Sequence, residues 1–247
     1  MKKPKEVKLS KKEKLRLELI EKAKKGLEKA FSSKEVMVTQ TINLLSDLEK
    51  IINLLYMRLS NWEQLYAEIP TKNIKNFFEI SKKIASGEEV KGVEVSSINL
   101  EKEDLEEIKS LAELGLRLIE EKERKEKYLQ KLVNELYPNL SHILPPKIVA
   151  LLIEKAGGVE KLALMPSSTI QLLGAEKALF KHLKFGTKAP KHGFIFQHLF
   201  VSSKPKKLRG RAARILANKI AIAARADAFS KNFIAKKLKE ELDKAKF

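Results

Sequence analysis

A glycine followed by a lysine-rich helix is the part of this sequence best suited to bind an anion. Gly174 separates an apolar segment from a predicted helix that begins at Ala175. Backbone amides at a helix start are unpaired, and Gly174 has no side chain to keep a phosphate away from them. In that helix Lys177, Lys181 and Lys184 recur at the spacing of one face. This pattern predicts contacts with a phosphate backbone.

The other residues of this helix have different expected roles. Glu176 would repel phosphate, so we expect it to pair with a basic group on a partner protein or within the domain. Phe180 and Leu183 are expected to turn toward the core. The alternative for Gly174 is that it only interrupts a helix, with no role in binding.

Basic side chains continue after this helix. Lys188, Lys191 and His192 lie in a predicted loop bounded by glycines, and Gln197 follows with two phenylalanines within 194–197. Such side chains could stack on unpaired bases or hydrogen-bond to them. Aromatic residues at alternate positions are also typical of a core, and the sequence leaves both interpretations open.

A second basic face is predicted on a helix over residues 207–225. Five polar or basic side chains lie within about 60° of one another at about 100° per residue: Lys207, Arg211, Arg214, Asn218 and Arg225. Arg209 adds a cation at the start of this helix. Arg225 could instead form a buried ion pair with Asp227, and this alternative to RNA contact stays open.

No pattern for covalent chemistry or metal binding is present in the sequence. The four histidines lack the helical His-Glu-x-x-His spacing, and there is no cysteine, Walker phosphate loop or dinucleotide fingerprint. Ser167, Ser168 and Thr169 follow Pro166 and are interpreted as helix caps. We therefore expect no catalytic residue, no metal site and no cofactor held by this chain.

Positive charge is concentrated in the second half of the chain. Residues 1–140 carry 28 basic and 25 acidic side chains, whereas residues 141–247 carry 22 and 7. An uncompensated excess favours an anionic partner, with a merely lysine-rich surface as the alternative. No apolar run reaches the roughly 18 to 20 residues that cross a bilayer, and no signal peptide is evident, so we expect a soluble intracellular protein.

Two long heptad-like patterns predict an all-α protein with an antiparallel coiled-coil arm over 36–137. Apolar residues, Trp62 among them, recur at steps of three and four over 38–66 and again over 105–136. The interrupted segment 67–100 is expected to form a tip. An arm that buries one seam tends to recruit further helices, so we expect self-association; a hairpin folded only on its own domain is the alternative.

The remaining segments lie on either side of this arm. Residues 1–35 are expected to form a basic N-terminal segment with a short helix, and 138–247 a compact helical domain. Two positions in the arm are unusually small, Ala112 and Gly115, and would let another helix approach closely.

Three strings in the C-terminal region resemble the Nop domain, the family of box C/D small ribonucleoprotein core proteins of archaea and the nucleolus. Residues 157–180 read GGVEKLALMPSSTIQLLGAEKALF, residues 186–198 read GTKAPKHGFIFQH, and residues 207–229 read KLRGRAARILANKIAIAARADAF. The coiled coil before them matches the family's order of domains. The resemblance therefore extends over roughly 34–235 and is greatest to the archaeal version.

The resemblance implies an RNA-binding scaffold of a 2′-O-methylation particle. In this family the protein binds a box C/D guide RNA at a kink-turn already occupied by a small ribosomal-type protein, and the coiled coil forms a homodimer. A separate N-terminal domain binds the methyltransferase fibrillarin, which holds S-adenosylmethionine. Only about 35 residues precede the arm here, which leaves direct fibrillarin binding in doubt.

The resemblance also implies a location and leaves two rival classes to be tested. The protein would be cytoplasmic in an archaeon and nucleolar in a eukaryote, with no membrane partner. One rival is a non-specific nucleic-acid-binding or chaperone-like oligomer that uses its basic half for phosphate contact. The other is a basic amphipathic protein attached to anionic membranes.

Overall fold

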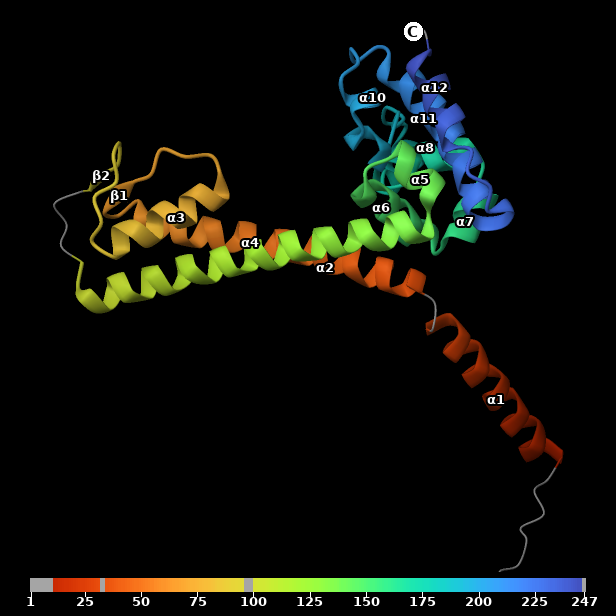
Figure 1. The fold of residues 1–247 in the computed structure, drawn as a ribbon, viewed down its shortest axis with the longest axis horizontal. Helices are drawn as coiled ribbons and strands as arrows, with labels where there is room; N and C mark the ends of the chain where they lie inside the picture. Colours follow the sequence, from red (N-terminus) through yellow and green to blue (C-terminus); the bar gives the residue numbers. More distant parts are fainter. Residues whose placement is uncertain (1–10, 32–33, 96–99, 246–247) are drawn as a thin grey trace, which may run out of the picture.

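The protein is almost entirely helical in the computed structural model, which describes residues 11–31, 34–95 and 100–245. Two long helices, α2 (Lys34–Glu63) and α4 (Lys102–Leu136), run antiparallel and form an arm, with a small tip at one end and a compact helical domain at the other (Figure 1). The prediction of an all-α fold is confirmed.

Apolar side chains at helical spacing hold the arm together. α2 buries residues at steps of three, four and seven, and α4 supplies their partners: Val38, Ile42, Leu45, Leu48, Ile52 and Leu59 on α2, with Ile108, Ala112, Leu129, Leu132 and Val133 on α4. Trp62 does not join this seam and is 49% exposed. It lies five full turns beyond exposed Leu44 and therefore on the same outer edge of α2.

The tip packs a short helix onto the end of the arm. Helix α3 (Ile74–Ala85) begins at Asn73, whose side chain accepts hydrogen bonds from two backbone amides, and two-residue strands β1 (Ala67–Glu68) and β2 (Glu94–Val95) pair antiparallel beside it. The Phe78 ring lies on Gly115, where an added Cβ would be only 2.6 Å from it. The close approach of a helix at Gly115 was predicted, and α3 of the same chain makes it.

The C-terminal domain consists of short helices packed around one core. Its central element is the alanine-rich helix α11 (Arg209–Arg225), which packs against several of the others. The other helices around this core are α5 (Pro138–Ile143), α6 (Pro146–Ala156), α7 (Val159–Leu164), α8 (Ser167–Leu172), α10 (Leu199–Ser202) and α12 (Ala235–Asp243). Of these, α6 packs mainly on the arm helices α2 and α4. A 3₁₀ turn η1 (Phe194–Gln197) and a π-helical turn η2 (Ala226–Ser230) complete the core, and α9 (Glu176–Phe185) projects from it.

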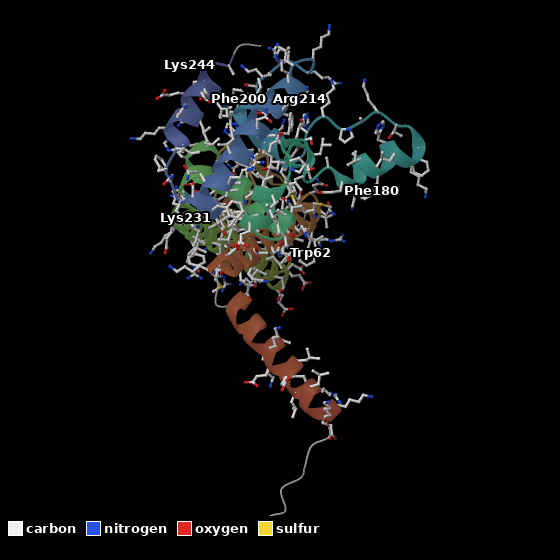
Figure 2. The ribbon with its side chains drawn as sticks, turned by 90° about the vertical axis from the view of Figure 1, so that its right-hand side faces the viewer. Trp62, Phe180, Phe200, Arg214, Lys231 and Lys244 are labelled. Carbon is white, nitrogen blue, oxygen red and sulfur yellow. The ribbon has the colours of Figure 1, made fainter. Side chains whose placement is uncertain are left out.

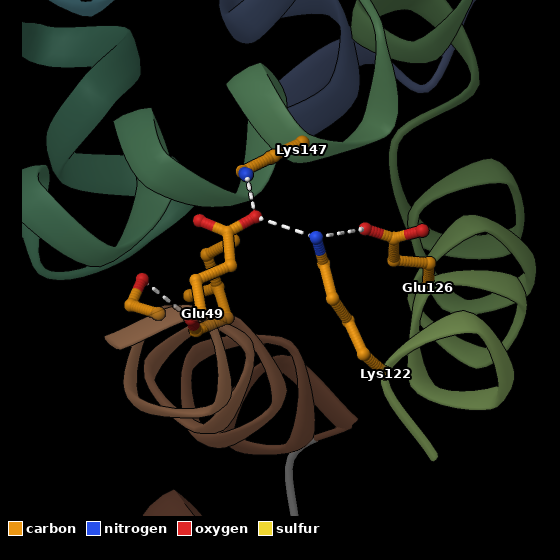
Figure 3. Close-up of polar contacts among 6 residues, drawn as sticks. Glu49, Lys122, Glu126 and Lys147 are labelled. Atoms are coloured by element: carbon orange, nitrogen blue, oxygen red, sulfur yellow. Dashed lines mark hydrogen bonds and ion pairs between the residues drawn. The ribbon is translucent and has the colours of Figure 1, made fainter. Parts of the chain in front are cut away.

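Charged side chains join the arm to this domain. The Glu49 carboxylate on α2 accepts from Lys147 Nζ on α6 at 2.6 Å and from Lys122 Nζ on α4 at 3.1 Å, and Lys122 also pairs with Glu126 (Figure 3). Partial burial raises the pKa of Glu49, but the hydrogen bonds from both lysines outweigh burial and hold this pKa below its usual value. These ion pairs lie beside the apolar core that the arm helices share with the domain.

Helix α1 (Lys11–Phe31) leaves the domain end of the arm and extends away from it (Figure 1). Its described side chains are exposed, Leu15 and Leu19 among them. Residues 1–10 of the predicted N-terminal segment lie outside the described part of the chain. Among the described residues, no helix is both long and apolar enough to cross a membrane.

Candidate nucleic-acid interface

The predicted hinge at Gly174 is a tight link between α8 and α9. Gly174 has φ of +89°, a conformation that favours glycine, and an added Cβ would lie 2.7 Å from the Phe194 ring. Gly193 approaches even more closely, because its added Cβ would lie 1.9 Å from the Leu173 carbonyl oxygen. Gly193 N and Phe194 N donate to the carbonyls of Gln171 and Leu173 at 2.9 and 2.8 Å. The hinge is thus held against the loop that returns from α9.

The two amides at the hinge are already hydrogen-bonded within the chain. Gly174 N donates to Glu176 Oε1 at 2.8 Å, and Ala175 N donates to the Leu172 carbonyl at 2.8 Å. The expectation that these amides are free for a phosphate is therefore wrong for this structure. Glu176 pairs within its own domain, as one predicted alternative held, but its partner is a backbone amide and not a basic side chain.

Helix α9 is mostly exposed, with Glu176, Leu179 and His182 half-buried. It buries none of its residues, and Figure 2 shows the helix, with Phe180 labelled, projecting from the domain. Phe180 and Leu183 are 68% and 70% exposed, so the prediction that they face the core is wrong. The reason is the hinge, which directs α9 away from the domain. Lys177, Lys181 and Lys184 are exposed along one face, as their spacing predicted.

A stack of three side chains lies beside the hinge. The His192 ring stacks on the Phe196 ring with centroids 4.4 Å apart and planes 12° apart, and the Arg209 guanidinium lies 5.2 Å from the same Phe196 ring. Burial and the Arg209 cation lower the pKa of His192, which favours its neutral form at pH 7. Phe194 and Phe196 pack against the core, so the core interpretation of these aromatic residues holds.

The loop after α9 connects this stack to the second basic face. Gln171 Nε2 donates to the Lys191 carbonyl at 2.6 Å, and the Lys191 side chain lies 3.6 Å from the Cβ position of Gly210 on α11. Arg209 Nε donates to the Lys204 carbonyl at 2.9 Å. These contacts place the loop directly on the first turn of α11. The amide of Gln171 was missed in the sequence, where only its position three residues before the glycine hinge could have suggested it.

The structure separates the predicted site residues into two groups. Lys191, His192 and Arg209 meet beside the hinge, whereas seven others project as separate exposed side chains from α9, its following loop, η1 and α11: Lys177, Lys181, Lys184, Lys188, Gln197, Arg211 and Arg214. Arg225 belongs to neither group, since its Nε donates to the Ala163 carbonyl at 3.1 Å. Asp227 pairs with Asn139, so the predicted Arg225–Asp227 ion pair is wrong.

This surface offers cations, neutral stacking rings and exposed polar groups in one region. Such a combination suits a phosphate backbone with unstacked bases. Within the described ranges, no three histidine, aspartate or glutamate side chains come together in a way that could hold a metal ion.

The arm, the hinge and the basic helical domain together define the class of protein: an all-α chain with a two-helix arm and a basic C-terminal domain. Residues 44–246 match the Nop family model, described as a snoRNA binding domain, fibrillarin. The chain belongs to the Nop family.

Relatives of this chain include proteins of archaea and eukaryotes. It is 40% identical to an uncharacterized NOP5 family protein of Methanocaldococcus jannaschii over 90% of this chain, and 35% identical to nucleolar protein 56 of Dictyostelium discoideum over 92%. The chain spans 58% and 49% of these relatives' own lengths. A solved fibrillarin/Nop5p complex matches 93% of this chain and 75% of its own, at 26% identity and a TM-score of 0.54.

Proposed function

We propose that this chain is the RNA-binding scaffold of a box C/D guide-RNA 2′-O-methylation ribonucleoprotein. It binds a kink-turn RNA together with the small ribosomal-type protein already seated on that RNA. It holds no cofactor and performs no catalysis. The methyl transfer and S-adenosylmethionine belong to a partner methyltransferase of the fibrillarin type, in keeping with the similarity to a fibrillarin/Nop5p complex.

The observation that carries this proposal is the junction of the hinge with α11. Gly193 permits the loop carrying Lys191 and His192 to lie directly under Gly174 and on the first turn of α11. Two basic elements far apart in sequence therefore form one surface, with α9 projecting beside it (Figure 2). A projecting basic helix can contact RNA while the surface at its base meets the protein bound to the same RNA.

The proposal includes self-association through the arm. α2 presents large apolar side chains on its outer edge, Leu44, Ile51 and Leu54 among them, each more than 40% exposed. Exposed apolar residues repeated along one helix mark an interaction face. By this proposal the particle is assembled in the nucleolus of a eukaryote or in the cytoplasm of an archaeon, and the eukaryotic relatives are nucleolar by name.

A gel-shift reconstitution tests the proposal. The protein is titrated onto a kink-turn RNA with and without its primary kink-turn protein, and onto a straight duplex of equal length. We expect tight binding only to the kink-turn RNA that carries the primary protein. Equal affinity for all three would support a non-specific phosphate-binding protein and overturn the proposal.

A further inference from the structure

A shallow apolar groove with an acidic rim lies at the far end of the arm. It occupies about 270 Å³ where α2 ends and α4 begins, and it is lined by Trp62, Leu65, Leu100 and Ile108 with Asp104 and Glu107. Trp62 and Leu65 are 49% and 63% exposed. An exposed tryptophan beside an exposed leucine, bordered by carboxylates, fits a basic amphipathic segment.

Helix α1 has the complementary character. Leu15 and Leu19 lie one turn apart and are 57% and 58% exposed, and Lys12 and Arg16 lie one turn apart beside them. Over its length α1 carries eight basic and four acidic residues. Its apolar stripe has no partner among the described residues, because α1 extends away from the rest of the molecule (Figure 1).

The α1 of the same chain is too short to reach this groove. If it folded back along α2, Leu19 would lie about 18 Å from the end of α1 at Phe31, at about 1.5 Å per residue. Trp62 lies about 42 Å along α2 from the start of that helix at Lys34, by the same rise. The shortfall is about 24 Å, roughly half the length of α2, so only α1 of another molecule could occupy the groove.

An antiparallel pair of arms would place α1 of a second copy near this groove. In such a pair the domain end of each arm lies beside the tip of the other, and α1 starts at the domain end (Figure 1). Pairing in the parallel direction would bring two C-terminal domains together, each with 22 basic and 7 acidic residues over 141–247. Charge repulsion therefore favours the antiparallel arrangement. It has two-fold symmetry, so both grooves are filled.

We propose that the groove formed by Trp62 and Leu65 binds α1 of a second copy of this chain. This inference rests on the self-association included in the proposed function. Leu15 and Leu19 of one copy enter the groove, and Lys12 and Arg16 face Asp104 and Glu107 of the other copy. α1 thereby links two arms that also pair along their outer edges.

Site-specific disulfide formation tests this contact directly. The chain has no cysteine, so any disulfide joins only introduced thiols. Chains carrying Leu19→Cys and chains carrying Leu65→Cys are mixed, equilibrated and oxidised. We expect a disulfide-linked dimer in the mixture and only background in either variant alone. Lys24→Cys mixed with Leu65→Cys is the control, because Lys24 lies on the opposite side of α1 from Leu15.

Sedimentation equilibrium gives a second measurement. Leu19→Asp should weaken self-association about ten-fold or more, since a carboxylate would enter an apolar groove with an acidic rim. Lys24→Asp matches it in the residue introduced and should leave the dimer within about two-fold of the wild type. Both variants should keep the wild-type helical circular dichroism.

The outcomes separate this inference from the proposed function. A wild-type dimer with no disulfide in the mixture above background overturns the docking of α1, while self-association stands. A disulfide within a single chain carrying both cysteines also overturns it. A wild type that is monomeric at tens of micromolar overturns both the docking and the self-association, whereas RNA recognition is judged separately by the gel shift.

Discussion

Asp227 holds the start of α5 and is bound by Asn139, a residue 88 positions earlier in the chain. Its Oδ1 accepts from Asn139 N at 3.0 Å and from Asn139 Nδ2 at 2.8 Å, and its Oδ2 accepts from Leu140 N at 2.9 Å. Asn139 Oδ1 in turn accepts from the amides of Ile234 and Ala235 at 2.7 and 3.0 Å. These two buried side chains connect α5, η2 and α12.

Replacing Asn139 by alanine should strongly destabilise the C-terminal domain. The change leaves Asp227 with fewer donors and two amides at the start of α12, one buried and one partly buried, without their acceptor. We expect a loss of about 3 kcal/mol in the free energy of unfolding. Urea unfolding followed by circular dichroism measures it. Ser141→Ala, two residues further along α5 and more exposed, should change stability by less than about 1 kcal/mol. Equal effects would contradict the assigned role of Asn139.

Glu63 should make the stability of the tip depend on pH. Glu63 is only 1% exposed, and neither carboxylate oxygen has a hydrogen-bond partner of normal geometry among the described residues. Burial raises its pKa to about 7, against a smaller lowering by the neighbouring Ser81 hydroxyl. In the unfolded chain the group titrates near 4.5. The folded tip therefore keeps the proton longer, and its stability falls as pH rises from about 4.5 through about 7.

The variant Glu63→Gln isolates this effect. It keeps the shape of the side chain and removes the charge, so above pH 7 it should be more stable than the wild type by up to about 3 kcal/mol. Near pH 4.5 the two proteins should unfold at the same urea concentration. A stability difference that is the same at pH 5 and pH 8 would show that Glu63 does not titrate in this range.

Replacing each of three glycines near the proposed interface by alanine should lower stability to a different extent. Gly193→Ala places Cβ against the Leu173 carbonyl and should cost about 3 kcal/mol or more. In Gly174→Ala the added Cβ would contact the Phe194 ring, and alanine is strained at a φ of +89°. The free energy of unfolding should therefore fall by about 2 kcal/mol. Gly186 has φ of +63° with nothing near its Cβ position, so alanine there should cost about 1 kcal/mol. Thermal unfolding of the three variants checks this order.

The arm and the basic surfaces were predictable because each depends on local spacing. Heptad positions such as Ile42 and Leu45 are buried as expected, and the lysines of α9 share one exposed face. The direction of α9 was not predictable, since it depends on Gly193 approaching Leu173 from 20 residues away. An amphipathic pattern places Phe180 and Lys181 on different sides of a helix, but it does not say whether any core lies beneath the apolar side.

Polar pairs between residues far apart in the chain could not be predicted from the sequence either. Asp227 follows Arg225 by two residues, which suggested an ion pair, but its partner Asn139 is identified only once α5 and η2 are packed together. Buried Glu63 gives no signal in the sequence either, because glutamate on a coiled-coil arm is normally solvated.

The lysine face of α9 gives the clearest test of RNA contact. Replacing Lys177, Lys181 and Lys184 together by alanine should leave stability nearly unchanged, since all three side chains are exposed and α9 buries nothing. Binding of the kink-turn complex should fall at least about ten-fold. If about six phosphates are contacted by the wild type, its logarithmic salt slope should be roughly −4 to −5. The triple variant should lose about two to three units of that slope.

Lys236, Lys237 and Lys239 of α12 provide the matched control. They are also exposed, and their replacement by alanine removes the same charge from a helix that lacks the hinge. Because a diffuse attraction depends on net charge alone, a non-specific protein would lose equal affinity in both triple variants. A protein that binds RNA through α9 should show weaker binding and a shallower salt dependence only when the α9 lysines are replaced. Equal losses of affinity in the two triple variants would therefore show that α9 is not part of the RNA interface.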